Sequence, residues 1–287
     1  MTFTSVQKAI LTTLAYRAIF SYPLTYHQLY SYLVFDGDDV DKESFDEALQ
    51  KLLEAKLIVQ DKLFYALSDL SKSSRQEKQE NSKRLHAKAV KISKLLGLIP
   101  SVMLIGITGA VAAGNARAND DIDVLIVTSG GKLWTTRFFV VLILKMLGLY
   151  RKDSNENAKI CPNIFMDEKA LLWQGDKSIY TAHEVFLLKP IFDRGDYYFK
   201  FLQENNWAAD FVPNMKVSFN SRQNFPENKI TGQNLIETFF MKLQLWYMKS
   251  KQTNEITMQK FIHFKKHDHK STILEEFEKK LKELNLS

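Results

Sequence analysis

The sequence is poor in the residues that build disulfide-linked or low-complexity chains. Its 287 residues include one cysteine, Cys161, six prolines and 11 glycines. A single cysteine excludes an intrachain disulfide framework and a zinc site built from several cysteines, so we expect a reducing, cytoplasmic location. The few prolines and glycines exclude a long low-complexity segment. A content of 45% hydrophobic and 25% charged residues is typical of a globular protein.

No uninterrupted apolar run is long enough to cross a membrane. The most apolar stretch, Leu133–Leu149, contains Arg137 and Lys145, which bracket only seven residues. A membrane-spanning helix needs about 20. We therefore expect a buried helix there and no membrane partner. Basic residues interrupt the apolar pattern of the first 20 residues, so we also expect no signal peptide.

The first 70 residues predict a winged-helix-like module. Helical patterns cover 6–20 and the segment that follows the capping-box residues Thr25 and Gln28. A third helix carries apolar residues at i, i+4 and i+7, and residues 57–67 predict two strands with a tight connection. This module has a net charge of −4. Nucleic-acid affinity needs a positive face, so DNA is a disfavoured partner and a packing role is favoured.

Residues 71–100 predict a basic linker helix, with a net charge of +6. An apolar stripe and a basic stripe run along it, the latter formed by Arg84, Lys88 and Lys91. Two interpretations stay open. The favoured one is a solvated face, and the other is a basic wall beside a phosphate-binding site.

Residues 101–215 predict a domain with strands at 102–107, 121–128 and 160–166. Helices are expected at 133–149, 180–188 and 196–210, and residues 216–287 predict a C-terminal region with helices at 235–248 and 271–284. The fold class is therefore α+β. Asp121 and Asp123 share one face at the head of the second strand, where two carboxylates can share divalent cations. Gly109 lets the backbone approach a phosphate closely.

This segment, with Gly109, Ala110, Asp121 and Asp123, resembles the nucleotidyltransferase superfamily that includes DNA polymerase beta and the minimal nucleotidyltransferases. More widely, the chain resembles an uncharacterised bacterial group that joins a winged-helix-like N-terminus to such a domain. The resemblance implies a domain built from a mixed sheet and helices. It also implies that this domain binds an NTP together with magnesium, with ATP as the first candidate. It also implies transfer of a nucleoside monophosphate to an acceptor that the sequence does not identify.

The resemblance assigns metal binding to Asp121 and Asp123. The family has a third carboxylate on a later strand, and here Asn163 and Asp167 compete for that position, so Asp167 is the third catalytic candidate. The candidates for phosphate and nucleotide contacts are Thr108, Gly109, Ala110, Arg117, Lys132 and Arg137. Ala110 replaces the family's usual serine.

Two further patterns have both a structural and a chemical interpretation. His183 and Glu184 could serve as acid and base, but a capping box from Thr181 to Glu184 is favoured. His263, His267 and His269 belong to a histidine-rich segment in which a basic surface is favoured over a metal cluster.

The leading hypothesis is a magnesium-dependent nucleotidyltransferase. The alternatives are a catalytically weak or inactive nucleotide-binding sensor, suggested by Ala110 and Asn163, and a winged-helix DNA-binding regulator.

Overall fold

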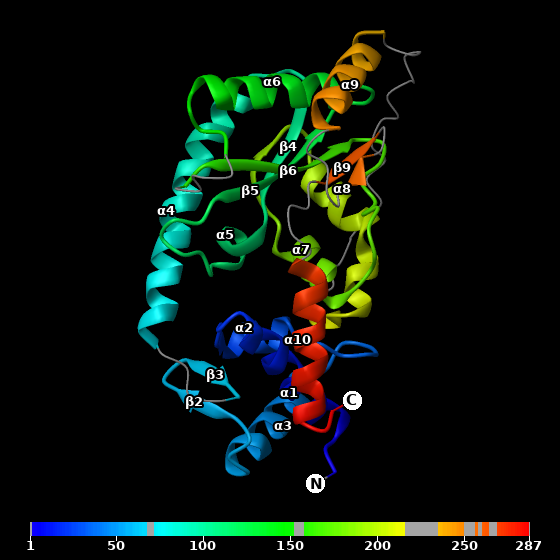
Figure 1. Cartoon of the computed structure of the whole chain (residues 1–287). Helices are drawn as coiled ribbons and strands as arrows, with labels where there is room; N and C mark the ends of the chain where they lie inside the picture. The colour runs from blue at the N-terminus through cyan, green and yellow to red at the C-terminus, as the bar shows by residue number, and fades with distance from the viewer. Residues whose placement is uncertain are drawn as a thin grey trace.

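The computed structural model describes residues 2–67, 72–151, 158–215, 235–249, 256–257, 260–263 and 269–286. Within these residues the chain is an α+β protein with a six-stranded mixed sheet and a three-stranded antiparallel sheet. Figure 1 shows the N-terminal helices and the small sheet at one end of the molecule and the large sheet towards the other. The fold class is confirmed at this level.

The N-terminal module holds three helices and the small sheet. The helices are α1 (Ser5–Ile19), α2 (Tyr26–Ser31) and α3 (Lys42–Glu54), and the strands β1 (Leu24–Thr25), β2 (Val59–Asp61) and β3 (Phe64–Ala66) lie in the order β1-β3-β2. The predicted capping box is confirmed, because Thr25 and Gln28 exchange backbone-to-side-chain hydrogen bonds. The three helices and the strand pair were predicted, whereas β1 is too short to give a periodic signal.

Helix α4 (Lys72–Leu96) runs along one side of the molecule from the small sheet to the large one (Figure 1). The sequence predicted either a polar linker or the start of a helix at 68–82. In the structure, helix α4 is unbroken from its first residue. Its second half packs on the large sheet through Leu85, Ala89, Ile92 and Leu96. The packing of this second half on the sheet explains why so long a helix is stable, because most helical stability in proteins comes from a packed apolar face.

The large sheet has the strand order β7-β4-β5-β6-β9-β8. Its strands are β4 (Val102–Ile107), β5 (Ile122–Thr128), β6 (Ile160–Asp167), β7 (Lys189–Asp193), β8 (Ile256–Thr257) and β9 (Phe261–His263). Strands β5 and β6 are parallel and are joined through α6 (Leu133–Met146), while the other neighbours are antiparallel. Strand β7 escaped prediction because it is an edge strand that contains Pro190.

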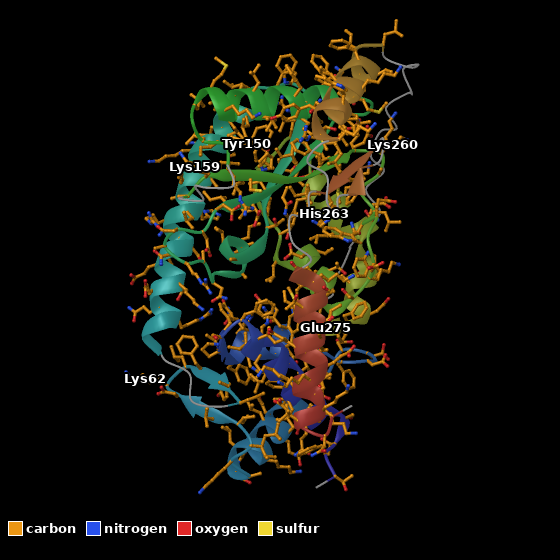
Figure 2. The ribbon with its side chains drawn as sticks, viewed as in Figure 1. Lys62, Tyr150, Lys159, Lys260, His263 and Glu275 are labelled. Carbon is orange, nitrogen blue, oxygen red and sulfur yellow. The ribbon has the colours of Figure 1, made fainter. Side chains whose placement is uncertain are left out.

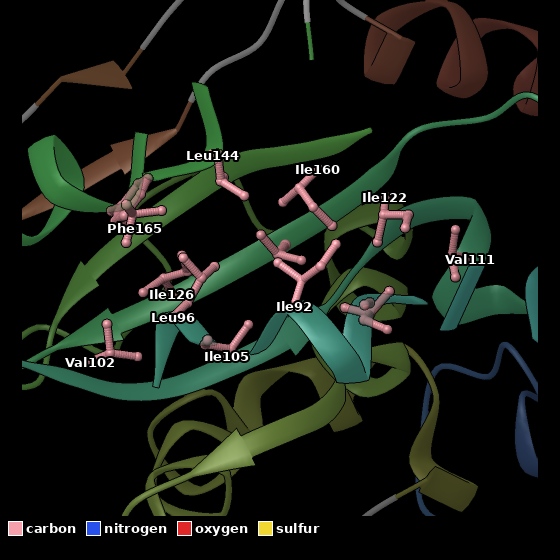
Figure 3. Packing of buried hydrophobic residues seen from close by; sticks show 14 of the residues in the cluster. Ile92, Leu96, Val102, Ile105, Val111, Ile122, Ile126, Leu144, Ile160 and Phe165 are labelled. Atoms are coloured by element: carbon pink, nitrogen blue, oxygen red, sulfur yellow. The ribbon is translucent and has the colours of Figure 1, made fainter. Parts of the chain in front are cut away.

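Helices cover both faces of this sheet. Alternate residues of β5 belong to two separate cores: Ile122 and Ile126 pack with α4 and α6, and Leu125 and Val127 pack on the other side. Figure 3 shows the first core, with Ile92 and Leu96 of α4 against the strand residues. The second core holds α7 (Ile179–Leu187), α8 (Tyr197–Glu204) and the short helix η1 (Asn206–Asp210), which is followed by η2 (Pro213–Met215).

The predicted C-terminal region is not purely helical. Helix α9 (Leu235–Met248) packs on α6, and α10 (His269–Glu283) packs on α1 of the N-terminal module. Between them, β9 pairs with β6 and extends the large sheet. Residues 261–263 are too few for alternation to reveal a strand, so their long-range partner decides their conformation. None of the described helices has the length and apolarity to span a membrane.

Candidate functional site

The turn between β4 and α5 (Gly109–Ala113) lies against the head of β5. The Thr108 N–H donates to the Asp123 carbonyl oxygen over 3.0 Å. Gly109 has φ +62°, and a β-carbon added there would lie 2.9 Å from Oδ2 of Asp123. Glycine is therefore required both by the left-handed backbone and by the carboxylate beside it.

Asp121 and Asp123 point to the same side of the sheet, as their spacing predicted. Ile122 between them is fully buried in the core under α4 and α6, so the two carboxylates face the side on which α7 lies. Across the parallel pair, Asp123 lies opposite Cys161 of β6. One side-chain oxygen of each aspartate and the Cys161 sulfur all lie within 4.8 Å of one another.

Arg151 completes this cluster from the segment between α6 and β6. Its Nη1 lies 2.7 Å from Oδ2 of Asp121 and also donates to the Cys161 sulfur over 3.6 Å. The Arg151 N–H donates to the Ile160 carbonyl oxygen, which fixes the backbone at this position beside β6. The sequence analysis did not single out Arg151, because its partners are distant along the chain.

Glu184 belongs to the site, and the favoured capping-box interpretation of this residue is wrong. Helix α7 begins at Ile179, and its capping box joins Ser178 to Thr181, one turn earlier than expected. Glu184 therefore lies in the second turn, where its carboxylate accepts the Gly109 N–H. The neighbouring His183 does not join it, because its ring stacks on Tyr16 with 4.8 Å between the ring centroids.

Burial and mutual repulsion make the carboxylates of this site unusually basic. Burial, then the negative charges of Asp121 and Glu184, raise the pKa of Asp123 well above its ordinary value. Burial also raises the pKa of Glu184 to about 7, against the Gly109 hydrogen bond, which lowers it. The pKa of the Cys161 thiol is raised by burial and by Asp123, so the sulfur is a neutral thiol at pH 7.

The donor set of this cluster fits a hard divalent cation. Magnesium uses one or two protein carboxylates together with substrate oxygens, and the two aspartates provide that number. A cation between them would offset the repulsion that raises the Asp123 pKa. Magnesium prefers oxygen ligands, so Asp121 and Asp123 are the candidates to hold it, and Cys161 is a neighbour of the metal position.

Asp167 lies away from the acidic pair. It faces Thr128 at the far end of β5, five residues beyond Asp123, which corresponds to about 16 Å along the strand. Its carboxylate accepts the N–H groups of Gly131, at 2.6 Å, and Lys169, at 3.0 Å. The structure therefore gives Asp167 a part in closing a loop and does not bring it to Asp123.

Asn163 is also displaced from the predicted third position. The ladder between β5 and β6 pairs Val124 with Pro162 and Leu125 with Ile164, so Asn163 is the extra residue of a bulge. The ladder pairs Asp123 with Cys161 before this bulge, so Cys161 and not Asn163 lies opposite Asp123.

The predicted phosphate contacts divide into two groups. Thr108, Gly109 and Ala110 form the turn at the site, and Arg117 is exposed in the loop that leads to Asp121. Lys132 and Arg137 lie outside it: Lys132 is exposed just before α6, and Arg137 is buried in that helix. Arg137 donates to the side-chain oxygen of Gln244 in α9.

The histidine-rich segment forms no described metal site. His263 lies in β9 (Figure 2), and its ring contacts Trp173 at 5.7 Å between centroids. His267 lies outside the described residues.

Comparison of the chain with protein-family models, curated proteins and solved structures finds no match in any of the three. The fold and the site therefore define the protein only as an α+β protein with a partly buried acidic cluster beside a glycine turn.

Proposed function

We propose that this chain is a magnesium-dependent nucleotidyltransferase that transfers a nucleoside monophosphate from an NTP to an acceptor. The observation that carries the proposal is the position of the Gly109 turn, where a β-carbon would lie 2.9 Å from the Asp123 carboxylate, with Asp121 on the same face. A glycine turn that lets phosphate oxygens approach, directly beside paired carboxylates that can hold a cation, is suited to phosphoryl-type transfer.

Each residue of the cluster has a role in this proposal. Asp121 and Asp123 would hold magnesium, which when bound would neutralise phosphate charge and polarise the phosphorus centre. Gly109 and its neighbours Thr108 and Ala110 line the approach of the phosphate chain. Arg151, already beside Asp121, adds positive charge where negative charge develops.

Glu184 is the third carboxylate in this proposal, in place of Asp167. It lies close enough to raise the pKa of Asp123, and its own pKa of about 7 matches neutral conditions. A base is most effective when its pKa is near the working pH, so Glu184 would accept the proton of an acceptor hydroxyl. Its hydrogen bond to the Gly109 N–H holds the carboxylate at the turn.

Cys161 supports a second candidate, a nucleotide-binding protein with weak or no transfer activity. The strand position opposite Asp123 carries a thiol that burial keeps neutral, where a carboxylate would give a third oxygen ligand. This candidate shares the binding step and lacks the transfer step. The DNA-binding alternative has less support, because the exposed face of α3 carries Glu43, Asp46, Glu47 and Glu54.

The binding step is tested by the thermal stability of the protein with ATP or GTP, with and without magnesium. We expect magnesium-dependent stabilisation of the wild type and its loss in the Asp121→Asn/Asp123→Asn variant. Asp167→Asn is the matched control, because it removes a buried carboxylate at the far end of the same strand pair. Equal stabilisation of all three proteins would overturn the assigned site.

The transfer step is tested by pyrophosphate release with Glu184→Gln. The amide oxygen can still accept the Gly109 N–H, so nucleotide binding should persist while release falls by roughly 100-fold or more, the usual contribution of a general base. Binding without release in the wild type, against a broad pool of acceptors, would favour the second candidate.

A further inference from the structure

A cleft of about 560 Å³ opens between the N-terminal module and the central domain. Its walls come from α2, α4, the end of α5 and the α7–β7 connection, elements that surround one region in Figure 1. The volume is within the range of small-molecule sites, roughly 300–1,000 Å³. None of the acidic site residues Asp121, Asp123 and Glu184 lines it.

The charged side chains that line this cleft are basic. Arg75 and Lys83 come from α4, and Lys189 comes from β7. His86 of α4 also lines the cleft, but burial and the charge of Lys189 lower its pKa, so its ring is neutral at pH 7. Among the described residues of the lining there is no aspartate or glutamate. The cleft therefore presents positive charge from two sides with no carboxylate facing it, which favours an anionic ligand.

Arg75 is 4% exposed and is only partly satisfied. Its guanidinium lies 3.4 Å from the centre of the Tyr22 ring, and Nη2 donates to the Gln28 side chain over 3.2 Å. Nε and Nη1 are buried with no hydrogen-bond partner among the described residues. Burial lowers the pKa of Arg75 to about 10, with a further contribution from the charge of Arg17.

Arg17 is a second buried cation behind the same wall. It is 5% exposed and lies 4.6 Å from the ring centre of Tyr32 and 6.0 Å from that of Tyr22, and both tyrosines line the cleft. In the part of the chain that the structure describes, its Nε and Nη2 have no hydrogen-bond partner. Tyr22 thus lies between two guanidinium groups of like charge, at 3.4 Å from Arg75 and 6.0 Å from Arg17.

Two neighbouring buried guanidinium groups, with no countercharge among the described residues, are costly. Buried charges in proteins are ordinarily paired, because an unpaired charge in the interior loses its hydration without gaining a partner. Contacts with aromatic rings offset only part of this cost. An anion in the cleft would supply the missing charge at short range in a medium of low dielectric constant.

We infer that this cleft binds a small phosphate-bearing anion with two or more negative charges. Arg75 forms the floor of the site, Lys83 and Lys189 meet the phosphate oxygens from the rim, and Arg17 adds to the positive potential behind Tyr22. Arginine and lysine clusters are suited to phosphate, and the tyrosine walls are suited to an organic group attached to it. The inference does not depend on the proposed transfer reaction, since no residue of the acidic cluster takes part.

The experiment measures binding of pyrophosphate and inorganic phosphate without divalent metal, by calorimetry and thermal stability, with sodium chloride at matched ionic strength as reference. We expect pyrophosphate to bind and to stabilise the wild type. Binding should weaken at least tenfold in Arg75→Met and severalfold in Lys189→Gln. Asp123→Asn should bind as the wild type does, which separates this site from the proposed metal site.

Arg75→Met also separates a ligand site from a merely structural arginine. If the arginine is kept for an anion, the ligand-free variant should be at least as stable as the wild type, because an uncompensated buried charge is gone. If Arg75→Met fails to fold, Lys189→Gln at the exposed rim decides the question. The inference is overturned by an absence of binding beyond the chloride reference, by equal binding in Lys189→Gln, or by dependence of binding on Asp123.

Discussion

Gly109 lies so close to the Asp123 carboxylate that a side chain at position 109 would displace this carboxylate. A β-carbon there would lie 2.9 Å from the Asp123 carboxylate, on a backbone with φ +62°. We predict that Gly109→Ala destabilises the fold by more than the 1–2 kcal/mol that a left-handed alanine costs by itself, about 2–3 kcal/mol in total. Because the Asp123 carboxylate would be displaced, the variant should also lose magnesium-dependent ATP binding.

Gly131→Ala is the matched control for this prediction. Gly131 has φ +68°, almost the same backbone, but an added β-carbon would meet nothing within 4 Å. Chemical denaturation and ATP-induced thermal shifts of the two variants separate backbone strain from the contact with Asp123. Equal losses of stability, with ATP binding intact in both, would mean that the contact has no functional consequence.

A site with three carboxylates on adjacent strands would have a carboxylate at position 161, where this chain has a cysteine. We predict that Cys161→Asp lowers the stability of the metal-free protein by about 1–3 kcal/mol, because a third carboxylate would be buried beside Asp121 and Asp123. Magnesium should restore stability, since the added carboxylate increases the negative charge that binds the cation.

Cys161→Ser keeps the size and the neutral character of the side chain, so its response to magnesium should match the wild type. The measurement is the melting temperature of each protein across a magnesium titration. A Cys161→Asp variant that magnesium stabilises no more than Cys161→Ser would place the cation elsewhere.

The parts of the site that follow from local geometry were predictable. Asp121 and Asp123 share a face because strand side chains alternate, and the neighbouring glycine marked the turn that approaches them. The strands at 102–107 and 121–128 and the helix at 235–248 were predicted within one residue of their observed bounds. In each of these segments, local pattern and tertiary packing favour the same conformation.

The remaining members of the site depend on contacts that the local pattern does not contain. The pairing of β5 with β6 puts Cys161 opposite Asp123, in the place expected for Asn163. Glu184 is free to face the site because the capping box of its helix joins Ser178 to Thr181, and Arg151 reaches the site through the pairing of Ile160 with Ile122. Register and packing between distant segments decide these positions.

Arg137 should stabilise the helical layer and contribute nothing to nucleotide binding. Its hydrogen bond to Gln244 joins α6 to α9, and Gln244 also donates to the Trp134 carbonyl oxygen over 2.8 Å. Arg137→Met would leave the buried Gln244 oxygen without its donor. We expect a loss of about 1–3 kcal/mol in the free energy of unfolding.

Lys132→Met is the comparison, because Lys132 is exposed and the change should stay within about 0.5 kcal/mol. Denaturation curves and ATP-induced thermal shifts measure both quantities for each variant. A reduced ATP response in either variant would return that residue to the nucleotide site.

His183 should make the protein sensitive to mild acid. The ring is 3% exposed, its Nδ1–H donates to the Ile179 carbonyl oxygen, and burial with the charge of Arg17 holds its pKa well below the ordinary value of 6.5. Below pH 6.5 the unfolded chain therefore binds a proton at this residue that the folded chain does not. Stability is lost as the pH falls, by up to about 1.4 kcal/mol per pH unit.

The variant His183→Phe keeps an aromatic ring against Tyr16 and removes the titration. Glu184 and Asp123 have the opposite effect on stability. Their pKa values are raised in the folded chain, so as the pH falls the folded chain takes up these protons before the unfolded chain does and gains stability. Both proteins contain these carboxyl groups, so the difference between the two stability curves isolates His183. Urea denaturation at pH 7.5, 6.5 and 5.5 should show the wild type losing stability relative to His183→Phe below pH 6.5. Parallel curves would mean that the imidazole is protonated equally in the folded and unfolded chains, and that its buried environment has no effect on its charge.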